Sequence, residues 1–333
     1  MHPDHFREAL EKAGLTDRLM VESMVVDWPL GKQSTKKDPS LPIAEFLGRP
    51  EEYYEFIQDK DILLIHTAPI TRASLERAPL LKLIGVARGG PVNVEIAAAK
   101  ERNVQIVNTP GRNASAVADF TIASTMAGLR HLVEAHHSVA DGSFSRRFYH
   151  RDFVGRELSE VVAGVVGYGA IGRRVVRLLT AFGTKVLIYD PYAKLDPEDE
   201  AKGAHIVPFD QLIEQADVVT LHPRVTPETR GMISREVIAR MKRDAFVVNT
   251  TRGEILDYDA LYDALTEGRL SGAALDTFPN EPPSADMPLL QLPNVILSPH
   301  IAGASRRSIN LAAEMLTEEV VRFLKGQPAV YPA

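Results

Sequence analysis

The segment between Val161 and Asp190 narrows the possible folds more than any other part of the chain. It reads VVAGVVGYGAIGRRVVRLLTAFGTKVLIYD: an apolar run, a Gly-x-Gly-x-x-Gly turn, a helical stretch, a second apolar run and an acid. In such a unit Gly167 permits the tight turn, Gly169 lets the backbone approach a pyrophosphate, and Gly172 lets the helix and strand pack closely. The terminal carboxylate can accept hydrogen bonds from ribose hydroxyls and would repel a 2′-phosphate. The segment therefore predicts a βαβ dinucleotide site that prefers NAD to NADP.

Composition limits the kind of protein around this unit. The chain has 333 residues, enough for two domains, and a formal net charge of −6, which gives no broad basic footprint for nucleic acid or anionic membrane. There is no cysteine, so disulfides, thiol catalysis and thiolate metal sites are excluded. The first residues are charged, unlike a signal peptide, and no apolar run approaches the roughly 20 residues that span a bilayer. We predict a soluble cytoplasmic protein with no metal site and with neither nucleic acid nor membrane as a partner.

Strand-like runs alternate with helical stretches along nearly the whole chain, which predicts a parallel α/β architecture. In the first third, Met24–Trp28, Asp61–His66 and Leu81–Ala87 are predicted strands, and residues 29–40 are a predicted exposed loop. After Asn113 we predict one long helix whose apolar residues cover more than one face, as in a helix packed between domains or subunits.

Beyond the dinucleotide unit, the short apolar runs DVVTLH, AFVVNTTRG, SGAALDTF and NVILSPH each end in polar residues. Ligands of a doubly wound sheet bind at the carboxyl ends of its strands, so these polar residues are expected on one rim. They are His222, Thr250, Arg252, Asp276 and His300. A final helix at roughly residues 305–325 has no place in this sheet, and we predict that it returns to the first domain.

Three side chains near this rim fit the chemistry of hydride transfer between NADH and a carbonyl. Such a reaction needs a proton donor for the oxygen and a cation that holds the substrate. Histidine as a residue type titrates in the right range, and His300 would be oriented by the carboxylate of Glu281. Arg252 can grip a substrate carboxylate through two parallel hydrogen bonds. The alternative is structural: a surface ion pair for Arg252, a solvated Glu281 and a hydrogen-bonded turn at His300.

Together with GYGAIG, the segments NTTRGEILD, LDTFPNEPP and LSPHIAG resemble the signature set of the D-isomer-specific 2-hydroxyacid dehydrogenases, a family that includes phosphoglycerate dehydrogenases and hydroxypyruvate reductases. The resemblance runs from about Asp61 to Arg322. It implies two doubly wound domains, with a Rossmann NAD-binding domain of residues 113–304 inserted in a discontinuous flavodoxin-like substrate domain of residues 1–112 and 305–333. It also implies a homodimer, with the region after Asn113 in the contact between subunits.

The same resemblance assigns roles within the site. Arg252, Glu281 and His300 take the roles given above, Asp276 contacts the nicotinamide carboxamide, and Ala170 and Ile171 face the pyrophosphate. The full set of expected cofactor contacts is Gly167, Gly169, Ala170, Ile171, Gly172, Asp190, His222, Thr226, Thr250, Asp276 and Gly303.

The expected substrate loop, GVARGGPVNVE, departs from the family pattern, with Arg88 in place of a glycine and Val92 in place of an aspartate. Gly89 and Gly90 can still offer N–H groups to a carboxylate. We predict that Arg88 contacts an anionic or hydroxyl-rich far end of the substrate. The alternative is that Arg88 pairs internally with an acid such as Glu95.

A second loop bears on the substrate. In phosphoglycerate dehydrogenases an arginine in this stretch helps to hold the phosphate, whereas here His66, Thr67 and Ala68 stand in the loop. We therefore predict an NAD-dependent dehydrogenase of a small polar 2-oxo or 2-hydroxy acid, hydroxylated or sugar-derived. Two alternatives stay open: a D-3-phosphoglycerate dehydrogenase, and, from another class, an NAD-binding dimeric module that resembles transcriptional corepressors and does not turn over substrate.

Overall fold

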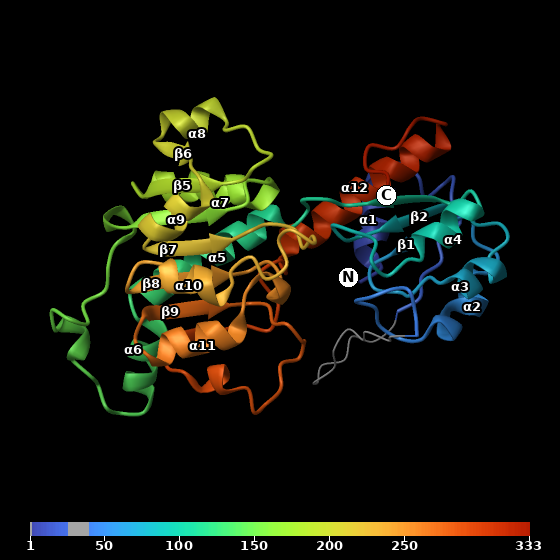
Figure 1. Ribbon diagram of the computed structural model, residues 1–333. Helices are drawn as coiled ribbons and strands as arrows, with labels where there is room; N and C mark the ends of the chain where they lie inside the picture. Colours follow the sequence, from blue (N-terminus) through green and yellow to red (C-terminus); the bar gives the residue numbers. More distant parts are fainter. Residues whose placement is uncertain (1, 26–39) are drawn as a thin grey trace. The chain divides into compact units, whose positions relative to one another are not determined.

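The computed structural model describes residues 2–25 and 40–333, and the chain divides into two compact units. The outer unit comprises Met1–Asn113 and Ser305–Ala333, and the central unit comprises Ala114–Ala304. Each unit is a parallel sheet covered by helices (Figure 1). No helix within the described ranges is long and apolar enough to cross a membrane.

The central unit is built on a seven-stranded parallel sheet of order β10-β9-β8-β7-β4-β5-β6. Its strands are β4 (Val162–Val166), β5 (Lys185–Tyr189), β6 (Ala204–Ile206), β7 (Val218–Leu221), β8 (Ala245–Asn249), β9 (Leu270–Leu275) and β10 (Val295–Leu297). The chain runs from β4 outward to β6, then returns beside β4 and runs outward to β10. The order therefore reverses between β4 and β7, and this switch point is where a doubly wound sheet binds its ligand. The predicted α/β fold with a Rossmann sheet is confirmed.

Helices cover both faces of this sheet. The helices of the unit are α5 (Ala114–Leu129), α6 (Leu132–Ala140), α7 (Ala170–Ala181), α8 (Pro197–Ala201), α9 (Phe209–Gln215), α10 (Arg235–Arg240) and α11 (Tyr258–Thr266), of which α6 has no buried residue. One buried cluster includes Leu212, Ile238 and Leu261 of α9, α10 and α11, and the other includes Ala118 of α5 and Val175 of α7. Burial from both sides explains why these strands are continuous apolar runs rather than alternating ones.

The long helix predicted after Asn113 is wrong in one respect, because it is two helices. α5 ends at Leu129 and α6 begins at Leu132, with His131 between them in the left-handed conformation at φ 53°. The ring of His131 stacks on Phe148 at 5.7 Å, and its Nδ1 lies 3.6 Å from a carboxylate oxygen of Glu134. A left-handed residue cannot continue an α-helix, so the direction of the chain changes here.

The outer unit has a three-stranded parallel sheet of order β1-β2-β3: β1 (Ile62–Ile65), β2 (Leu83–Val86) and β3 (Gln105–Asn108). Its helices are α1 (Asp4–Lys12), α2 (Tyr54–Ile57), α3 (Arg72–Arg77), α4 (Ile96–Glu101) and α12 (Arg306–Leu324). Side chains of α1 and α12 form one buried cluster with β2 and β3, including Leu10, Leu83, Val107 and Leu316.

Two of the three strands predicted in the first third are present as β1 and β2. In the third predicted strand, Met24 and Val25 adopt no strand structure, and residues 26–28 lie outside the described residues. Nearly all of the predicted loop, residues 29–39, lies outside them as well.

Candidate active site

The glycine-rich turn joins β4 to α7 at the switch point of the central sheet. Gly167 has φ +92°, and Gly169 caps α7 without a side-chain hydrogen bond. A Cβ built on Gly169 would meet nothing within 4 Å, so open space lies before the first N–H groups of α7, those of Ala170 and Ile171. By contrast, a Cβ on Gly172 would lie 2.0 Å from the carbonyl oxygen of Gly167. This turn is a cradle for an anion at a helix N-terminus, and a pyrophosphate fits its chemistry.

Asp190 follows β5 and binds the glycine-rich turn directly. Its Oδ2 accepts the N–H of Tyr168 at 2.8 Å, while its Oδ1 accepts the N–H groups of Tyr192 and Ala193 at 3.0 and 3.1 Å. The carboxylate thus fixes the position of two loops at once, a role that the spacing alone did not indicate. The hydroxyl of Tyr192 in turn donates to Glu228 at 2.8 Å and bridges the loops after β5 and β7.

His300 and Glu281 form a directly bonded pair. Nδ1 of His300 lies 2.7 Å from Oε2 of Glu281, whose Oε1 accepts the N–H of Phe278 at 3.1 Å. The two side chains are 37% and 32% exposed, so the pair is accessible to a small molecule. Burial acts to raise the pKa of Glu281, but the hydrogen bond and charge of His300, the Phe278 N–H and the charge of Arg252 together hold that pKa below its usual value. Glu281 is therefore an anion at neutral pH and a hydrogen-bond acceptor for Nδ1 of His300.

Asp276, buried at the end of β9, holds the loop that carries His300. Its Oδ1 accepts the Ser298 hydroxyl at 2.6 Å and the Ile301 N–H at 2.9 Å, and its Oδ2 accepts the Ala302 N–H at 2.8 Å. Its carbonyl oxygen accepts the N–H of His300, which has φ 55°. Sequence reasoning missed this positioning role, although an acid at the end of a buried strand was its signal. The expected contact with a carboxamide stays a prediction.

Arg252 reaches the same rim from the end of β8. Its Nη1 donates to the Thr251 carbonyl at 2.8 Å, and its side chain is exposed. The next residue, Gly253, packs against the backbone of Phe278: a Cβ there would lie 2.1 Å from the Phe278 carbonyl carbon. This close approach brings the Arg252 loop against the Glu281 loop, and the Arg252 charge contributes to the low pKa of Glu281. The structure thus brings together the three residues predicted as the catalytic set.

In the outer unit, Arg88 follows β2 and is paired internally. Its Nη1 donates to the Glu45 carbonyl at 3.0 Å, and its Nη2 bonds to the Glu45 carboxylate. Arg88 thus pairs internally, as in the alternative predicted from the sequence, but its partner is Glu45. The carboxylate of Glu95 instead accepts the N–H of Arg72 at 2.7 Å and pairs with the Arg72 side chain at 3.7 Å. Glu45 lies 43 residues before Arg88, and no pattern in the sequence pointed to it.

Residues 122–302 match the model of the D-isomer specific 2-hydroxyacid dehydrogenase, NAD binding domain. The chain belongs to this family. It is an oxidoreductase and its cofactor is NAD, as the sequence predicted. The open cradle before α7 and the acid after β5 fit that cofactor.

Similar proteins differ in the acid named for each. The chain is 39% identical over 274 residues to a glyoxylate reductase of Korarchaeum cryptofilum, covering 82% of both chains. It is 38% identical over 315 residues to a D-3-phosphoglycerate dehydrogenase of Methanocaldococcus jannaschii, covering 93% of this chain but only 59% of that longer protein. Among solved structures, the TT0316 protein of Thermus thermophilus aligns with TM-score 0.80 and 31% identity, covering 98% of this chain and 96% of that one.

Two other predicted cofactor contacts of this dehydrogenase, His222 and Thr226, lie in the segment after β7, the strand beside β4. His222 is buried after β7 with Nε2 2.9 Å from the Thr220 hydroxyl, and burial lowers its pKa to about 3, so its ring is neutral. A Cβ on Gly167 would lie 2.9 Å from the carbonyl carbon of His222, which places that backbone against the turn. Thr226 forms a small turn with Thr229 through hydroxyl and N–H contacts of 2.8 to 3.3 Å.

Two predicted contacts lie on neighbouring loops. Thr250 follows β8, and its hydroxyl lies 2.9 Å from that of Thr121 on α5. Gly303 lies in the loop after His300.

The glycine-rich turn allows a paired test of packing and cofactor binding. We expect Gly172→Ala to lower the free energy of unfolding by about 1–3 kcal/mol, because its Cβ would overlap a backbone carbonyl. Gly169→Ala has open space, so its stability should change by less than about 0.5 kcal/mol while its methyl group obstructs the cradle and weakens NADH binding. Thermal unfolding and NADH fluorescence titration separate the two effects. Equal losses of stability in both variants would contradict the assignment of Gly172 to helix–strand packing and of Gly169 to the cradle.

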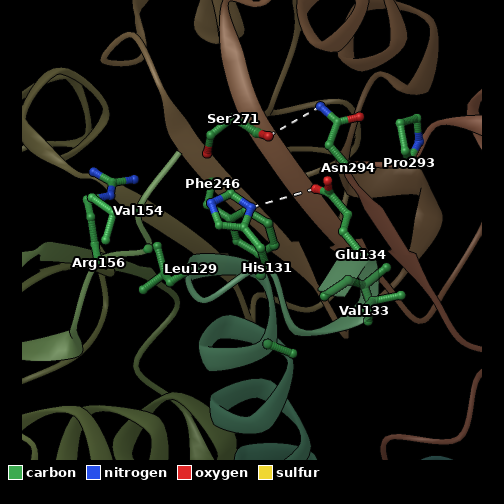
Figure 2. Close-up of a pocket in the computed structure, with 14 residues that line it drawn as sticks. Leu129, His131, Val133, Glu134, Val154, Arg156, Phe246, Ser271, Pro293 and Asn294 are labelled. Carbon is green, nitrogen blue, oxygen red and sulfur yellow. Dashed lines mark hydrogen bonds and ion pairs between the residues drawn. The ribbon is translucent and has the colours of Figure 1, made fainter. Parts of the chain in front are cut away.

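A pocket lies at the opposite end of the central sheet (Figure 2). It is lined by the junction of α5 and α6 and by the starts of β8 and β9, including His131, Glu134, Phe246 and Ser271. Asn294 at its wall donates to the Ser271 carbonyl at 3.2 Å. None of the predicted site residues lines this pocket, and it is remote from the carboxyl ends of the strands, where the catalytic set lies.

Proposed function

We propose that this dehydrogenase interconverts a small polar 2-oxo acid, hydroxylated or sugar-derived, and the corresponding D-2-hydroxy acid. The observation that carries the proposal is the 2.7 Å contact between His300 and Glu281 beside the cationic Arg252. The relative named as a glyoxylate reductase supports a small 2-oxo acid.

In this proposal each catalytic residue has one task. When bound, the reduced cofactor NADH would supply a hydride to the 2-oxo acid, and the oxidised cofactor NAD⁺ would accept one from the 2-hydroxy acid. His300 gives a proton to the substrate carbonyl oxygen during reduction and takes it from the hydroxyl in the reverse direction. Glu281 holds Nδ1, which leaves Nε2 for the substrate, and Arg252 binds the carboxylate next to the reacting carbon. Arg88, Gly89 and Gly90 contact the rest of the substrate.

The cofactor would be held by the cradle and by the loops around it. The proposed contacts are Gly167, Gly169, Ala170, Ile171, Gly172, Asp190, His222, Thr226, Thr250, Asp276 and Gly303. The central unit is then the NAD-binding domain, and the outer unit is the substrate domain.

A homodimer belongs to the same proposal. Large apolar side chains are exposed on α6 and the segment after it: Leu132 and Val139 are each 61% exposed, Phe144 is 66% exposed and Val154 is 58% exposed. Such a concentration favours burial against another protein surface, here that of a second copy. Light scattering measures the mass directly. The cytoplasmic location stays a prediction.

D-3-phosphoglycerate dehydrogenase is the second candidate, favoured by the relative from Methanocaldococcus jannaschii. An NADH-consumption assay separates the candidates, with glyoxylate, hydroxypyruvate, pyruvate, phenylpyruvate, 2-oxoglutarate and phosphohydroxypyruvate as substrates. We expect hydroxypyruvate or glyoxylate to be reduced fastest. Turnover of phenylpyruvate as fast as hydroxypyruvate would contradict a polar substrate, and NADH binding without any turnover would favour the corepressor-like module.

A further inference from the structure

Tyr168, the residue after the first glycine of the turn, is held at each of its polar groups. Its side chain is buried, and its hydroxyl bonds to the carboxylate of Asp199 on α8. Its N–H donates to Asp190 at 2.8 Å, and its carbonyl oxygen accepts Nε of Arg173 at 3.3 Å. Burial and the bond to Asp199 raise the pKa of Tyr168 to about 12, so its phenol is neutral at neutral pH. The peptide group that leads into Gly169 is therefore fixed in place.

The guanidinium of Arg173 lies against this peptide from the first turn of α7. Its central carbon is 4.8 Å from the centroid of the Tyr168 ring, while its Nε donates to the Tyr168 carbonyl. Because a cation is attracted to the face of an aromatic ring, the ring and the carbonyl together hold the guanidinium beside the turn. The side chain of Arg173 is half-buried, and it leaves the space at Gly169 open.

No carboxylate within residues 2–25 and 40–333 pairs with Arg173. Its contacts there are the ring and the carbonyl of Tyr168. By contrast, Arg177, one turn further along α7, pairs with Asp196 at 2.9 Å and with Asp199 at 3.0 Å. The first turn of α7 contains no acidic residue, and a cation there is disfavoured by the positive end of the helix dipole. An anionic ligand at this end of α7 would relieve that repulsion.

We propose that Arg173 is a cofactor-binding residue whose guanidinium bonds to the pyrophosphate of NAD, beside the N–H groups of Ala170 and Ile171. The inference rests on the part of the proposed function in which the cradle holds the cofactor, and it is independent of which acid is the substrate. Guanidinium groups form strong charged hydrogen bonds to phosphate oxygens, and both Nη atoms of Arg173 have no bond to a described residue. The carboxylate of Asp190 binds three backbone N–H groups instead of this guanidinium.

The test compares ADP, which carries a pyrophosphate, with adenosine, which does not, as competitors of NADH in a fluorescence titration. We expect Arg173→Met to raise the dissociation constants of NADH and ADP by at least about tenfold, as for the loss of a hydrogen bond between charged groups. The dissociation constant of adenosine should stay within about twofold of wild type, because adenosine lacks the phosphates. Arg173→Lys keeps the charge and should lose less affinity for ADP.

Arg174→Met is the matched control. Arg174 is the next residue of α7 and carries the same charge at the same end of the helix, but its side chain is exposed. Its removal should change the dissociation constant of ADP by less than about twofold, since a screened surface charge contributes little. This control separates a bond to the pyrophosphate from the general effect of removing one positive charge.

The possible results distinguish the inference from the proposal on which it rests. A dissociation constant for ADP that is unchanged in Arg173→Met, or raised equally in Arg174→Met, overturns the inference, as does an equal weakening of ADP and adenosine. If ADP does not compete with NADH in wild type, the proposed role of the cradle fails as well. If Arg173→Met does not fold, modification of wild-type arginines by phenylglyoxal is measured: protection of Arg173 by ADP but not by adenosine supports the inference, and any other pattern overturns it.

Discussion

The His300→Gln variant is expected to reduce 2-oxo acids about 10²- to 10⁴-fold more slowly than wild type, the usual loss when a general acid is removed. Glutamine keeps a similar size and can still bond to Glu281, but it cannot give up a proton at neutral pH. NADH affinity should be unchanged, because the cradle before α7 is built from other residues. Single-turnover reduction measured at saturating NADH and substrate reports the chemical step, and fluorescence titration reports NADH binding.

The Glu281→Gln variant tests the role of the carboxylate partner, whereas His300→Gln tests the role of the proton donor. Since the pKa of Glu281 is held low, the wild-type carboxylate stays ionised through the neutral range and keeps its contact with Nδ1 of His300. In wild type this carboxylate takes up a proton only when the pH falls below the usual range of a glutamate, and the rate of reduction should then fall; Glu281→Gln should lack that acid limb. At neutral pH Glu281→Gln should reduce 2-oxo acids more slowly than wild type, because the imidazole has lost its charged partner. A normal rate in His300→Gln, or in Glu281→Gln, would remove the pair from the mechanism.

Arg252→Lys is expected to lower kcat/KM for 2-oxo acids by about 10²-fold, although the positive charge is kept. Lysine cannot form the two parallel hydrogen bonds that orient a carboxylate and, through it, the neighbouring carbonyl. The loss should appear in both kcat and KM, because orientation matters most in the transition state. Steady-state kinetics with the best substrate of the panel measure it.

The matched control is Arg243→Lys, since Arg243 is an exposed arginine just before β8 whereas Arg252 comes just after it. It should behave as wild type. If Arg252→Lys were also fully active, the carboxylate anchor would have to be another cation, and Arg88 or Arg112 would be the next to replace.

Much of the central unit could be predicted because its signals are local. The spacing of Gly167 and Gly172 reflects a turn that only glycine fits. Each buried strand is a short apolar run in the sequence, and the polar residues that follow the run mark the end of the strand. Parallel strands place those ends on one rim, so Arg252 and His300 could be predicted to lie near each other. Glu281 could be predicted from chemistry, as the partner that such a histidine requires.

The rest depends on contacts between distant segments. Nothing in the neighbourhood of Arg88 marks Glu45 as its partner, and Glu95 looked suitable only because it is close in sequence. His131, in the left-handed conformation, interrupts a stretch whose sequence predicts one continuous helix. Its ring stacks on Phe148, which belongs to a segment further along the chain, so the local sequence did not reveal this contact. Asp276 has the polarity expected of a ligand-binding residue, yet three hydrogen bonds commit its carboxylate to the loop of His300.

The packing of α12 against α1 has a consequence for the order in which the molecule assembles during synthesis. Leu83 of β2 and Val107 of β3 share a buried cluster with Leu316 and Val320 of α12. A ribosome makes these strands early but makes α12 only after the entire central unit, so the cluster is incomplete while that unit emerges. Domains generally fold as they are made, and exposed apolar surface promotes aggregation. The central unit is therefore able to fold first, and the early strands stay vulnerable to aggregation until α12 has emerged.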